Sequence, residues 1–173
     1  ANYGNRYLTG DFHNQSHVDV NRILYITGTG AQSTNSGTIQ INSGSLQINQ
    51  SGTTPSFTNT GNINGGPITV TNGTFTHDGG NLDGTGTFTA TSATVNWNQP
   101  LPNRPLVFSS SIVNGGNLTA LANANFTSTT LNATSWTNGS GLQMTVNSNN
   151  TVSSDLHNDG YFLFNGFTNN LTG

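Results

Sequence analysis

The sequence predicts an all-β protein, a right-handed parallel β-helix (β-solenoid) with coils of about 20 residues. Three observations predict it: short stretches of alternating apolar and polar residues, Gly- and Asn-rich turns between them, and apolar residues that recur at a constant spacing. No stretch has the apolar period of an amphipathic helix, and Lys and Glu are absent. The alternative fold with this pattern is an antiparallel β-sandwich or jelly roll.

The strand signal consists of short runs that are each bounded by Gly, Asn or Ser. These runs are TIQIN (38–42), SLQIN (45–49), PITVTN (67–72), GTFTATS (86–92), LQMTVN (142–147) and YFLFNGF (161–167). Asn-Gly pairs at 64–65, 72–73, 114–115, 138–139 and 165–166 predict turns, because these residues tolerate positive φ.

The spacing of the apolar residues predicts how the strands stack. Ile68, Phe75 and Leu82 follow one another at steps of seven, which suits a short strand and a bend. Three such sides close one coil, so residue i lies above residue i+20, and Phe108 is expected above Phe88. We expect six or seven coils after residue 30, in a rod about 30–35 Å long at about 4.8 Å per layer.

The composition excludes several classes of protein. Asn, Thr, Gly and Ser make up 95 of the 173 residues, charged residues only 5%, and the net charge is −3. Three Arg cannot build a basic groove, and no apolar run reaches the roughly 18 residues of a membrane span, so we expect neither a nucleic-acid partner nor a membrane span. Without Cys there is no thiol chemistry. The first residue is Ala, which suggests a removed leader or an excerpt and fits an extracellular or cell-surface location.

The chain divides into two regions by composition. Residues 1–30 contain two of the three Arg, two of the six Asp and three of the four Tyr, so we expect an N-terminal cap or inter-subunit arm. Residues 31–173 form the predicted β-solenoid body. Within it, the Pro-rich segment 99–105 (QPLPNRP) predicts a protruding loop.

The acidic residues do not form a catalytic pattern. Two carboxylates on adjacent coils should lie about one coil apart, but the positions one coil from Asp78 are Thr58 and Asn98. Asp155 and Asp159 are only four residues apart. A lyase that uses calcium and a basic residue would find no Lys in this chain, and Arg104 lies in the Pro-rich segment. No GxSxG motif of a serine hydrolase occurs. We therefore expect no enzymatic activity and no cofactor.

Two further groups of residues resemble metal ligands. Asp11, His13, His17 and Asp19 fall within nine residues, and alternation would place them on one strand face. The sets His77/Asp78/Asp83 and Asp155/His157/Asp159 could each hold a cation. Zinc sites favour ordered sets of His and Cys, so we predict polar solvated segments rather than metal sites.

Outward positions on the predicted strands carry hydroxyl groups. If Ile68, Val70, Phe88 and Ala90 point inward, the intervening residues form a surface hydroxyl ladder. This ladder contains Thr69, Thr71, Thr89, Thr91, Ser109, Ser111 and Thr129. Such a ladder could bind ice or polysaccharide, although β-branched Thr also suits any outward strand position.

Nine Asn-x-Ser/Thr sequons provide candidate glycosylation sites. They begin at Asn14, Asn49, Asn72, Asn117, Asn125, Asn132, Asn138, Asn149 and Asn170. With 28 Asn in this composition, chance gives about seven sequons, so their number is no evidence of selection. Asn ladders in the coil bends are the competing use of these side chains, because a stacked amide satisfies backbone groups at turns.

The two ends of a coil stack leave unpaired backbone groups that can template another chain. The segment VNRILYITG (20–28) is the most apolar part of the first thirty residues, and its neighbours supply Tyr and Arg, which are enriched at interfaces. The predicted assembly interface contains Tyr3, Arg6, Tyr7, Arg22, Leu24, Tyr25 and Ile26. Strand addition at such ends, head to tail, produces an open filament.

Three stretches resemble secreted bacterial β-helix repeat proteins. They are TVTNGTFTHDGGNLDGTGTFTATSATVNWN (69–98), NLTALANANFTSTTLNATSW (117–136) and DLHNDGYFLFNGF (155–167). The shared pattern of Gly-Gly, Gly-x-Gly-Thr-x-Thr and a later Trp corresponds to Gly79, Gly80, Gly84, Gly86, Thr87, Thr89 and Trp97. The resemblance covers residues 35–167, and the first thirty residues do not join in it.

This resemblance implies a right-handed parallel β-helix in a surface protein of the adhesin, sheath or filament type. Together with the predicted ends, it leads us to expect a structural extracellular protein that assembles with itself. The alternative function is a carbohydrate- or ice-binding module that uses the hydroxyl ladder, with polysaccharide as the partner.

Overall fold

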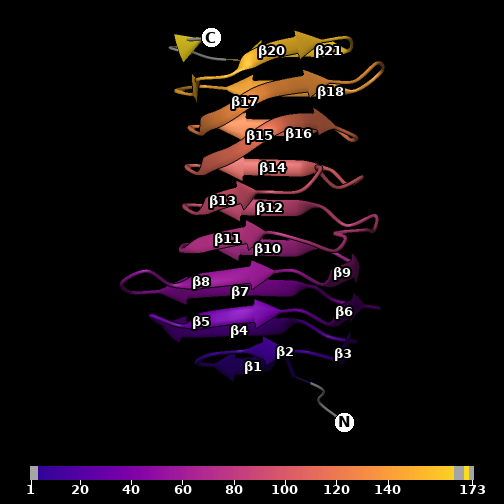
Figure 1. The fold of residues 1–173 in the computed structure, drawn as a ribbon, viewed down its shortest axis with the longest axis vertical. Coiled ribbons are helices and arrows are strands. Elements are labelled where there is room, and N and C mark those ends of the chain that lie inside the picture. The colour runs from indigo at the N-terminus through magenta and orange to yellow at the C-terminus, as the bar shows by residue number, and fades with distance from the viewer. Residues whose placement is uncertain (1–3, 166–169, 172–173) are drawn as a thin grey trace.

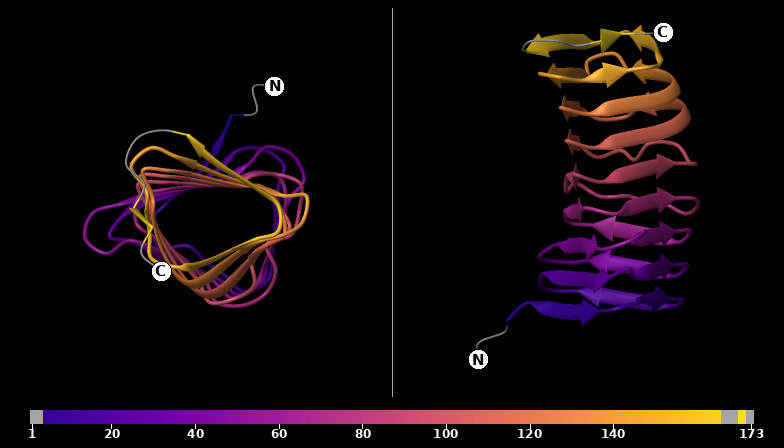
Figure 2. Two further views of the ribbon diagram at one scale, coloured as in Figure 1. Left: turned by 90° about the horizontal axis from the view of Figure 1, so that it is seen from above. Right: turned by 90° about the vertical axis from the view of Figure 1, so that its left-hand side faces the viewer.

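The structure is a computed structural model that describes residues 4–165 and 170–171. The strands in these residues pair in parallel, none of these residues is helical, and the chain winds into a stack of coils (Figure 1). The first strand, β1, and the penultimate strand, β21, lie at opposite ends of the stack (Figure 2). The β-solenoid is therefore confirmed, and the antiparallel sandwich is excluded.

Three parallel sheets form the sides of the coils. Sheet A contains β1 (Arg6–Thr9), β4 (Leu24–Thr29), β7 (Leu46–Ser51), β10 (Ile68–Thr71), β12 (Phe88–Thr91), β14 (Leu106–Ser109), β16 (Ala124–Thr127), β18 (Gln143–Asn147) and β21 (Tyr161–Asn165). Sheet B contains β2 (His13–Asn14), β5 (Gln32–Asn35), β8 (Ser56–Asn59), β11 (Thr74–His77), β13 (Thr94–Trp97), β15 (Ile112–Ala120), β17 (Thr130–Asn138), β19 (Thr151–Val152), β20 (Asp155–Asn158) and β22 (Asn170–Leu171). Sheet C contains only β3 (His17–Val20), β6 (Thr38–Ile41) and β9 (Asn62–Gly65).

The first coil belongs to the segment that we expected to be a cap or arm. Strands β1, β2 and β3 pair with β4, β5 and β6 of the next coil, in the same three sheets as the body. From Arg6 on, this segment therefore continues the stack.

The repeat is about 20 residues, but individual coils differ in length. Leu46 pairs with Ile68, Ile68 with Phe88, and Phe88 with Leu106, which are steps of 22, 20 and 18 residues. The predicted stacking of Phe108 on Phe88 is therefore wrong, because Phe108 pairs with Ala90. The cause of this shift lies on the third side of the coil, where the loop 98–105 after β13 is two residues shorter than the loop 78–87 after β11.

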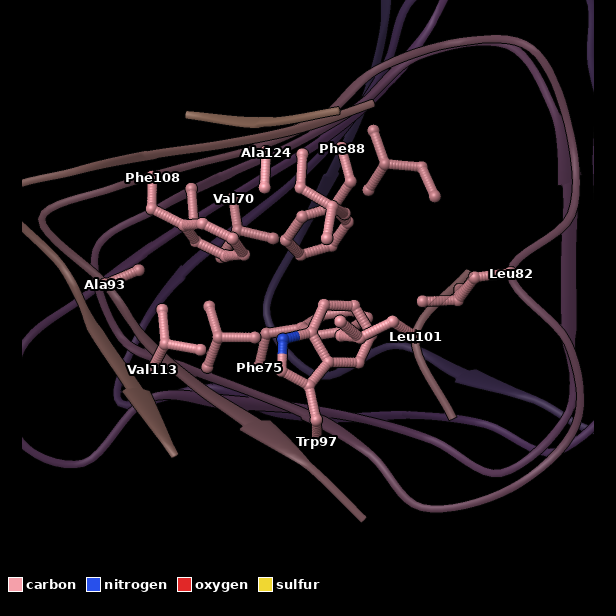
Figure 3. Close-up of a cluster of buried hydrophobic side chains, with 14 of the residues drawn as sticks. Val70, Phe75, Leu82, Phe88, Ala93, Trp97, Leu101, Phe108, Val113 and Ala124 are labelled. Carbon is pink, nitrogen blue, oxygen red and sulfur yellow. The ribbon is translucent and has the colours of Figure 1, made fainter. Parts of the chain in front are cut away.

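A narrow apolar column fills the interior. The inward residues of sheets A and B alternate with outward polar ones, as the short strands predict. Phe75 lies 5.2 Å from Phe88, and Phe88 lies 5.3 Å from Trp97, between ring centroids (Figure 3). These aromatic side chains are at most 1% exposed, so a thin body still buries a continuous core.

The corner between sheets A and B reverses the alternation of the chain. Asn72, Ser92, Ser110 and Ser128 directly follow strands of sheet A and have φ of 61°, 52°, 50° and 49°. A left-handed residue at this corner turns the residue after it inward, as shown by the burial of Ala93. Each of these corners costs some backbone free energy, because a left-handed conformation is unfavourable for residues other than Gly.

The Pro-rich segment 99–105 does not protrude along its length. Leu101 is buried in the core, and the side chain of Arg104 is only 1% exposed. The Arg104 guanidinium donates to the backbone carbonyl oxygens of Asp83 at 2.5 Å, Gly66 at 3.3 Å and Gly65 at 3.4 Å. Arg104 thus supplies donors to carbonyl groups on the side of the coil where sheet C has ended. Burial lowers the pKa of Arg104 to about 10, and the nearby Asp83 carboxylate opposes this shift, so the guanidinium remains charged at neutral pH.

Candidate functional surfaces

One outward column of sheet A carries a hydroxyl or amide group in every coil. It consists of Thr9, Thr27, Asn49, Thr71, Thr91, Ser109, Thr127, Asn147 and Asn165. Side chains contact each other near both ends of the column: Thr9 Oγ1 lies 3.3 Å from Thr27 Oγ1, and Asn147 Nδ2 donates to Thr127 Oγ1 at 3.3 Å. We call this row the hydroxyl column.

Five of the seven residues of the predicted ladder lie at outward positions of sheet A. Thr71, Thr91 and Ser109 lie in the hydroxyl column, and Thr69 and Thr89 pair with each other in the adjacent outward column. The other two residues, Ser111 and Thr129, do not belong to the ladder.

Ser111 and Thr129 lie inside the coil rather than on its surface. Ser111 is 3% and Thr129 is 1% exposed, and each hydroxyl donates to a backbone carbonyl, of Ser109 and Thr127 respectively. The sequence prediction extended strand alternation through Ser110 and Ser128, but these residues are the left-handed corners that turn the next residue inward.

A buried amide ladder runs up the interior at the end of the sheet B strands. Asn14 Nδ2 donates to Asn35 Oδ1 at 2.7 Å, and Asn35 Nδ2 donates to Asn59 Oδ1 at 2.6 Å. Asn59 Nδ2 also donates to the backbone carbonyl of Gly61 at 2.8 Å, which satisfies the bend. The expected use of Asn in the coil bends is therefore confirmed. In an upper coil, Asn138 Nδ2 donates to Asn158 Oδ1 at 2.8 Å.

The ladder ends in a histidine that the sequence analysis considered as a cation ligand but assigned to a polar solvated segment. His77 lies above Asn59 in the sheet register and is 2% exposed. Burial lowers the pKa of His77 to about 4, against the effects of a hydrogen bond to the Asn59 backbone and of the Asp78 carboxylate. His77 is therefore neutral and has a structural role in the interior. The signal in the sequence is its spacing of 18 residues from Asn59, which is one coil.

The candidate glycosylation sites divide by exposure. Asn14 and Asn138 are buried in the amide ladders, so their side chains are not accessible acceptors in the folded chain. Six others are exposed or half-buried on the surface: Asn49, Asn72, Asn117, Asn125, Asn132 and Asn149. The side chain of Asn170 lies outside the described residues.

The candidate metal ligands near the N-terminus are not brought together. His13 lies on β2 in sheet B, whereas His17 and Asp19 lie on β3 in sheet C, so the prediction of one strand face is wrong. A corner at Gln15 and Ser16 separates the two strands. His17 Nε2 contacts Asp19 Oδ1 at 3.2 Å, while the carboxylate of Asp11 accepts from the backbone N–H of Gln32 at 2.8 Å.

The other two proposed sets of cation ligands are not assembled either. Within residues 4–165, no group of three or more His, Asp or Glu side chains is placed to hold a metal ion. His77 points into the core, and the exposed Asp78 carboxylate accepts from Asn98 Nδ2 at 3.0 Å.

Some residues of the predicted assembly interface lie in the core, and others lie at the exposed end of the coil stack. Leu24 and Ile26 are 7% and 0% exposed, because β1 covers β4, so they must be removed from the interface. Arg6, Tyr7 and Arg22 are exposed, and the Tyr7 ring stacks on Tyr25 with centroids 4.7 Å apart. Tyr3 lies outside the described residues.

Comparisons with family models, curated proteins and solved structures give no match to this chain. No membrane-crossing helix is found among the residues that the structure describes.

Proposed function

We propose that this chain is a structural unit of an extracellular filament, sheath or adhesive surface, and that it assembles head to tail through the two ends of the solenoid. The observation that carries the proposal is that both end layers expose large apolar side chains, on strands that have a partner strand along only one edge within residues 4–165 and 170–171. Tyr7 is 63% exposed and Leu8 40% on β1, and Tyr161 is 70% and Phe164 47% exposed on β21.

The register of sheet A defines how one copy would continue into the next. Position by position, β21 and β1 belong to the same columns, because every sheet A strand is in register with its neighbours. Continuing the stack places Leu163 next to Tyr7 of the next copy, and Phe164 next to Leu8. It also places Asn165 next to Thr9, so the hydroxyl column crosses the junction without a break.

The N-terminal end is open enough to receive this layer. A hollow of about 330 Å³ is lined by apolar residues, among them Leu8, Phe12, Val18 and Leu24, and by the charged residues Arg6, Asp19 and Arg22. In the same register Phe162 would lie over Arg6, an arrangement in which an aromatic face attracts a guanidinium. Strand addition would also supply backbone partners to both edges.

The composition supports a passive role outside the cell. With only 5% charged residues, contacts between copies would depend weakly on salt. With three Arg and no Lys, the chain offers few cleavage sites to trypsin-like proteases. Stacked hydrogen bonds and the apolar column would provide rigidity without disulfides.

Two single substitutions test the head-to-tail junction. Leu8→Asp should block the N-terminal end, and Phe164→Asp should block the C-terminal end, because each places a carboxylate in an apolar contact. The wild-type chain should form filaments by electron microscopy and show concentration-dependent sedimentation. Each variant alone should remain monomeric, whereas an equimolar mixture should form dimers, since it restores one intact pair of ends.

Thr91→Asp, on the side of the rod, is the control and should polymerise like the wild type. Monodisperse wild-type monomers at all concentrations would contradict the proposal. So would dimers of either end variant alone, because these would require like ends to pair.

A second candidate function is binding of a flat repetitive surface, either ice or polysaccharide. The observation that favours it is the hydroxyl column, which continues through all nine strands of sheet A. Thermal hysteresis and a pull-down on insoluble polysaccharide test this function. Thr91→Tyr should reduce the measured effect, and Thr94→Tyr, on sheet B, should not.

A further inference from the structure

A groove forms where the strands of sheet B differ in length. Strand β13 ends at Trp97, whereas β15 and β17 continue to Ala120 and Asn138. The second half of β15 therefore has no strand of the preceding coil beside it, and the loop at 98–100 runs there instead. The resulting groove has a volume of about 830 Å³, within the range of ligand-binding pockets.

The surface of the groove carries an ordered row of amides. Asn132 Nδ2 donates to Asn114 Oδ1 at 3.2 Å, and Asn114 Nδ2 donates to Asn96 Oδ1 at 2.9 Å. Asn96 Nδ2 continues the row by donating to Thr76 Oγ1 at 3.3 Å. These bonds fix the orientation of the amides. They use one N–H and one lone pair of Asn114, so a second N–H and a second lone pair can bind a ligand.

The same groove contains apolar surface and open floor. Leu121 is 51% exposed, and Pro100 is exposed on the loop at 98–100. At Gly116 an added Cβ would meet no atom within 4 Å, so the space above this residue is empty of protein. None of the described residues that line the groove is charged.

A second hollow extends the binding surface. It has a volume of about 390 Å³ and shares Gln99, Pro100 and Leu121 with the groove. A ligand longer than one ring could therefore contact both hollows across the Leu121 side chain.

We propose that this groove binds a neutral oligosaccharide. Its hydroxyl groups would bond to the row of Asn96, Asn114 and Asn132, and the C–H face of a sugar ring would pack on Leu121 and Pro100. An anionic ligand would lose hydration without gaining a counter-charge, because the groove has no charged lining residue and the second hollow has only the carboxylate of Asp83. An apolar ligand would leave the amides unpaired. The site is distinct from the hydroxyl column and from both end layers, so it does not depend on the proposed assembly.

Calorimetric titration of the full chain tests the proposal with probes of equal length. Cellohexaose, chitohexaose and maltohexaose are the neutral probes, and hexagalacturonate is the anionic one. We expect at least one neutral hexasaccharide to bind, and hexagalacturonate to bind at least about tenfold more weakly than it. Gly116→Trp should fill the groove and weaken binding by at least about tenfold. Asn114→Ala should weaken it about threefold to tenfold.

The matched controls lie on sheet A. Asn125→Ala removes an outward amide from β16, and Thr145→Trp adds the same bulk on β18. Neither should change the affinity. If Gly116→Trp fails to fold by thermal melting, Leu121→Ser provides the same test at an exposed position.

Three outcomes would overturn the proposal. One is no binding of any neutral hexasaccharide at millimolar concentration. The second is equal affinity for the anionic probe. The third is loss of binding in the sheet A controls while the groove variants bind normally, which would transfer sugar binding to the face of the hydroxyl column.

Discussion

The imidazole of His77 lies directly above the side-chain amide of Asn59, whose Nδ2 donates to His77 Nδ1 at 3.1 Å inside the coil stack. Below them, Asn35 donates to Asn59 and Asn14 donates to Asn35, so a column of four buried polar side chains is linked by hydrogen bonds. The His77 ring also meets the edge of Trp97, with centroids 5.7 Å apart and planes at 83°. The hydrogen-bonded interior is thus joined to the aromatic core at a single titratable residue.

This junction predicts that the protein loses stability in mild acid. Because burial lowers the pKa of His77 from 6.5 to about 4, the unfolded chain binds a proton between these values that the folded chain does not. This contribution is fully present above pH 6.5 and is lost as the pH falls toward 4, with a slope of at most about 1.4 kcal/mol per pH unit.

Urea unfolding between pH 4 and 7.5 measures this effect. His77→Asn should continue the amide ladder and flatten the pH dependence by about one proton, since Asn does not titrate. His157→Asn, at an exposed position on β20, is the control. Equal slopes for the wild type and His77→Asn would refute the assignment.

The buried ladder predicts unequal effects of two Asn-to-Ala substitutions. Asn35→Ala removes the acceptor of Asn14 and the donor to Asn59, so it should lower the free energy of unfolding by about 3 kcal/mol. Asn147→Ala removes a surface amide that bonds to Asn125 at 2.7 Å, and should cost at most about 0.5 kcal/mol. Urea denaturation compares the two, and equal losses would show that the ladder adds no particular stability.

The left-handed corners predict that the effect of a Val substitution on stability depends strongly on its position. Ser110 has a φ of 50°, where a β-branched side chain is strained, so Ser110→Val should destabilise the fold by about 2 kcal/mol. Ser109→Val, one residue earlier on an outward strand position, should change the stability by less than about 0.5 kcal/mol. Thermal unfolding distinguishes the two variants. A larger loss at Ser109 would mean that the corner lies elsewhere.

The buried guanidinium of Arg104 predicts a further contrast in stability between two substitutions. Arg104→Met should lower the unfolding free energy by about 3 kcal/mol, because the carbonyl oxygens of Asp83, Gly65 and Gly66 would lose their shared donor. Arg6→Met, at an exposed end position, should leave the monomer within about 0.5 kcal/mol of the wild type. Chemical denaturation at low protein concentration, where assembly does not contribute, measures both. A small effect at Arg104 would contradict its role in closing the third side.

The candidate surfaces were predictable where strand alternation was sufficient. Thr71 and Thr91 were expected on the surface and form the hydroxyl column, because a strand fixes the side on which each residue lies. Leu24 and Ile26 were wrongly assigned to the assembly interface, because the sequence did not show that β1 pairs with β4 and forms the end of the sheet in its place. The groove at Gly116 had no sequence signal, since it arises from the unequal lengths of two strands in adjacent coils.

The sequence by itself determined the all-β class, the positions of strands such as Ile68–Thr71 and Phe88–Thr91, and an average repeat of about 20 residues, because alternation and turn residues are local properties. Only the tertiary structure decided the pairing of Phe108 with Ala90 and the burial of Ser111, Thr129, His77 and Arg104. These features depend on the lengths of separate loops and on the sign of φ at a single corner residue. One left-handed residue reverses the side on which the residues of the next strand lie.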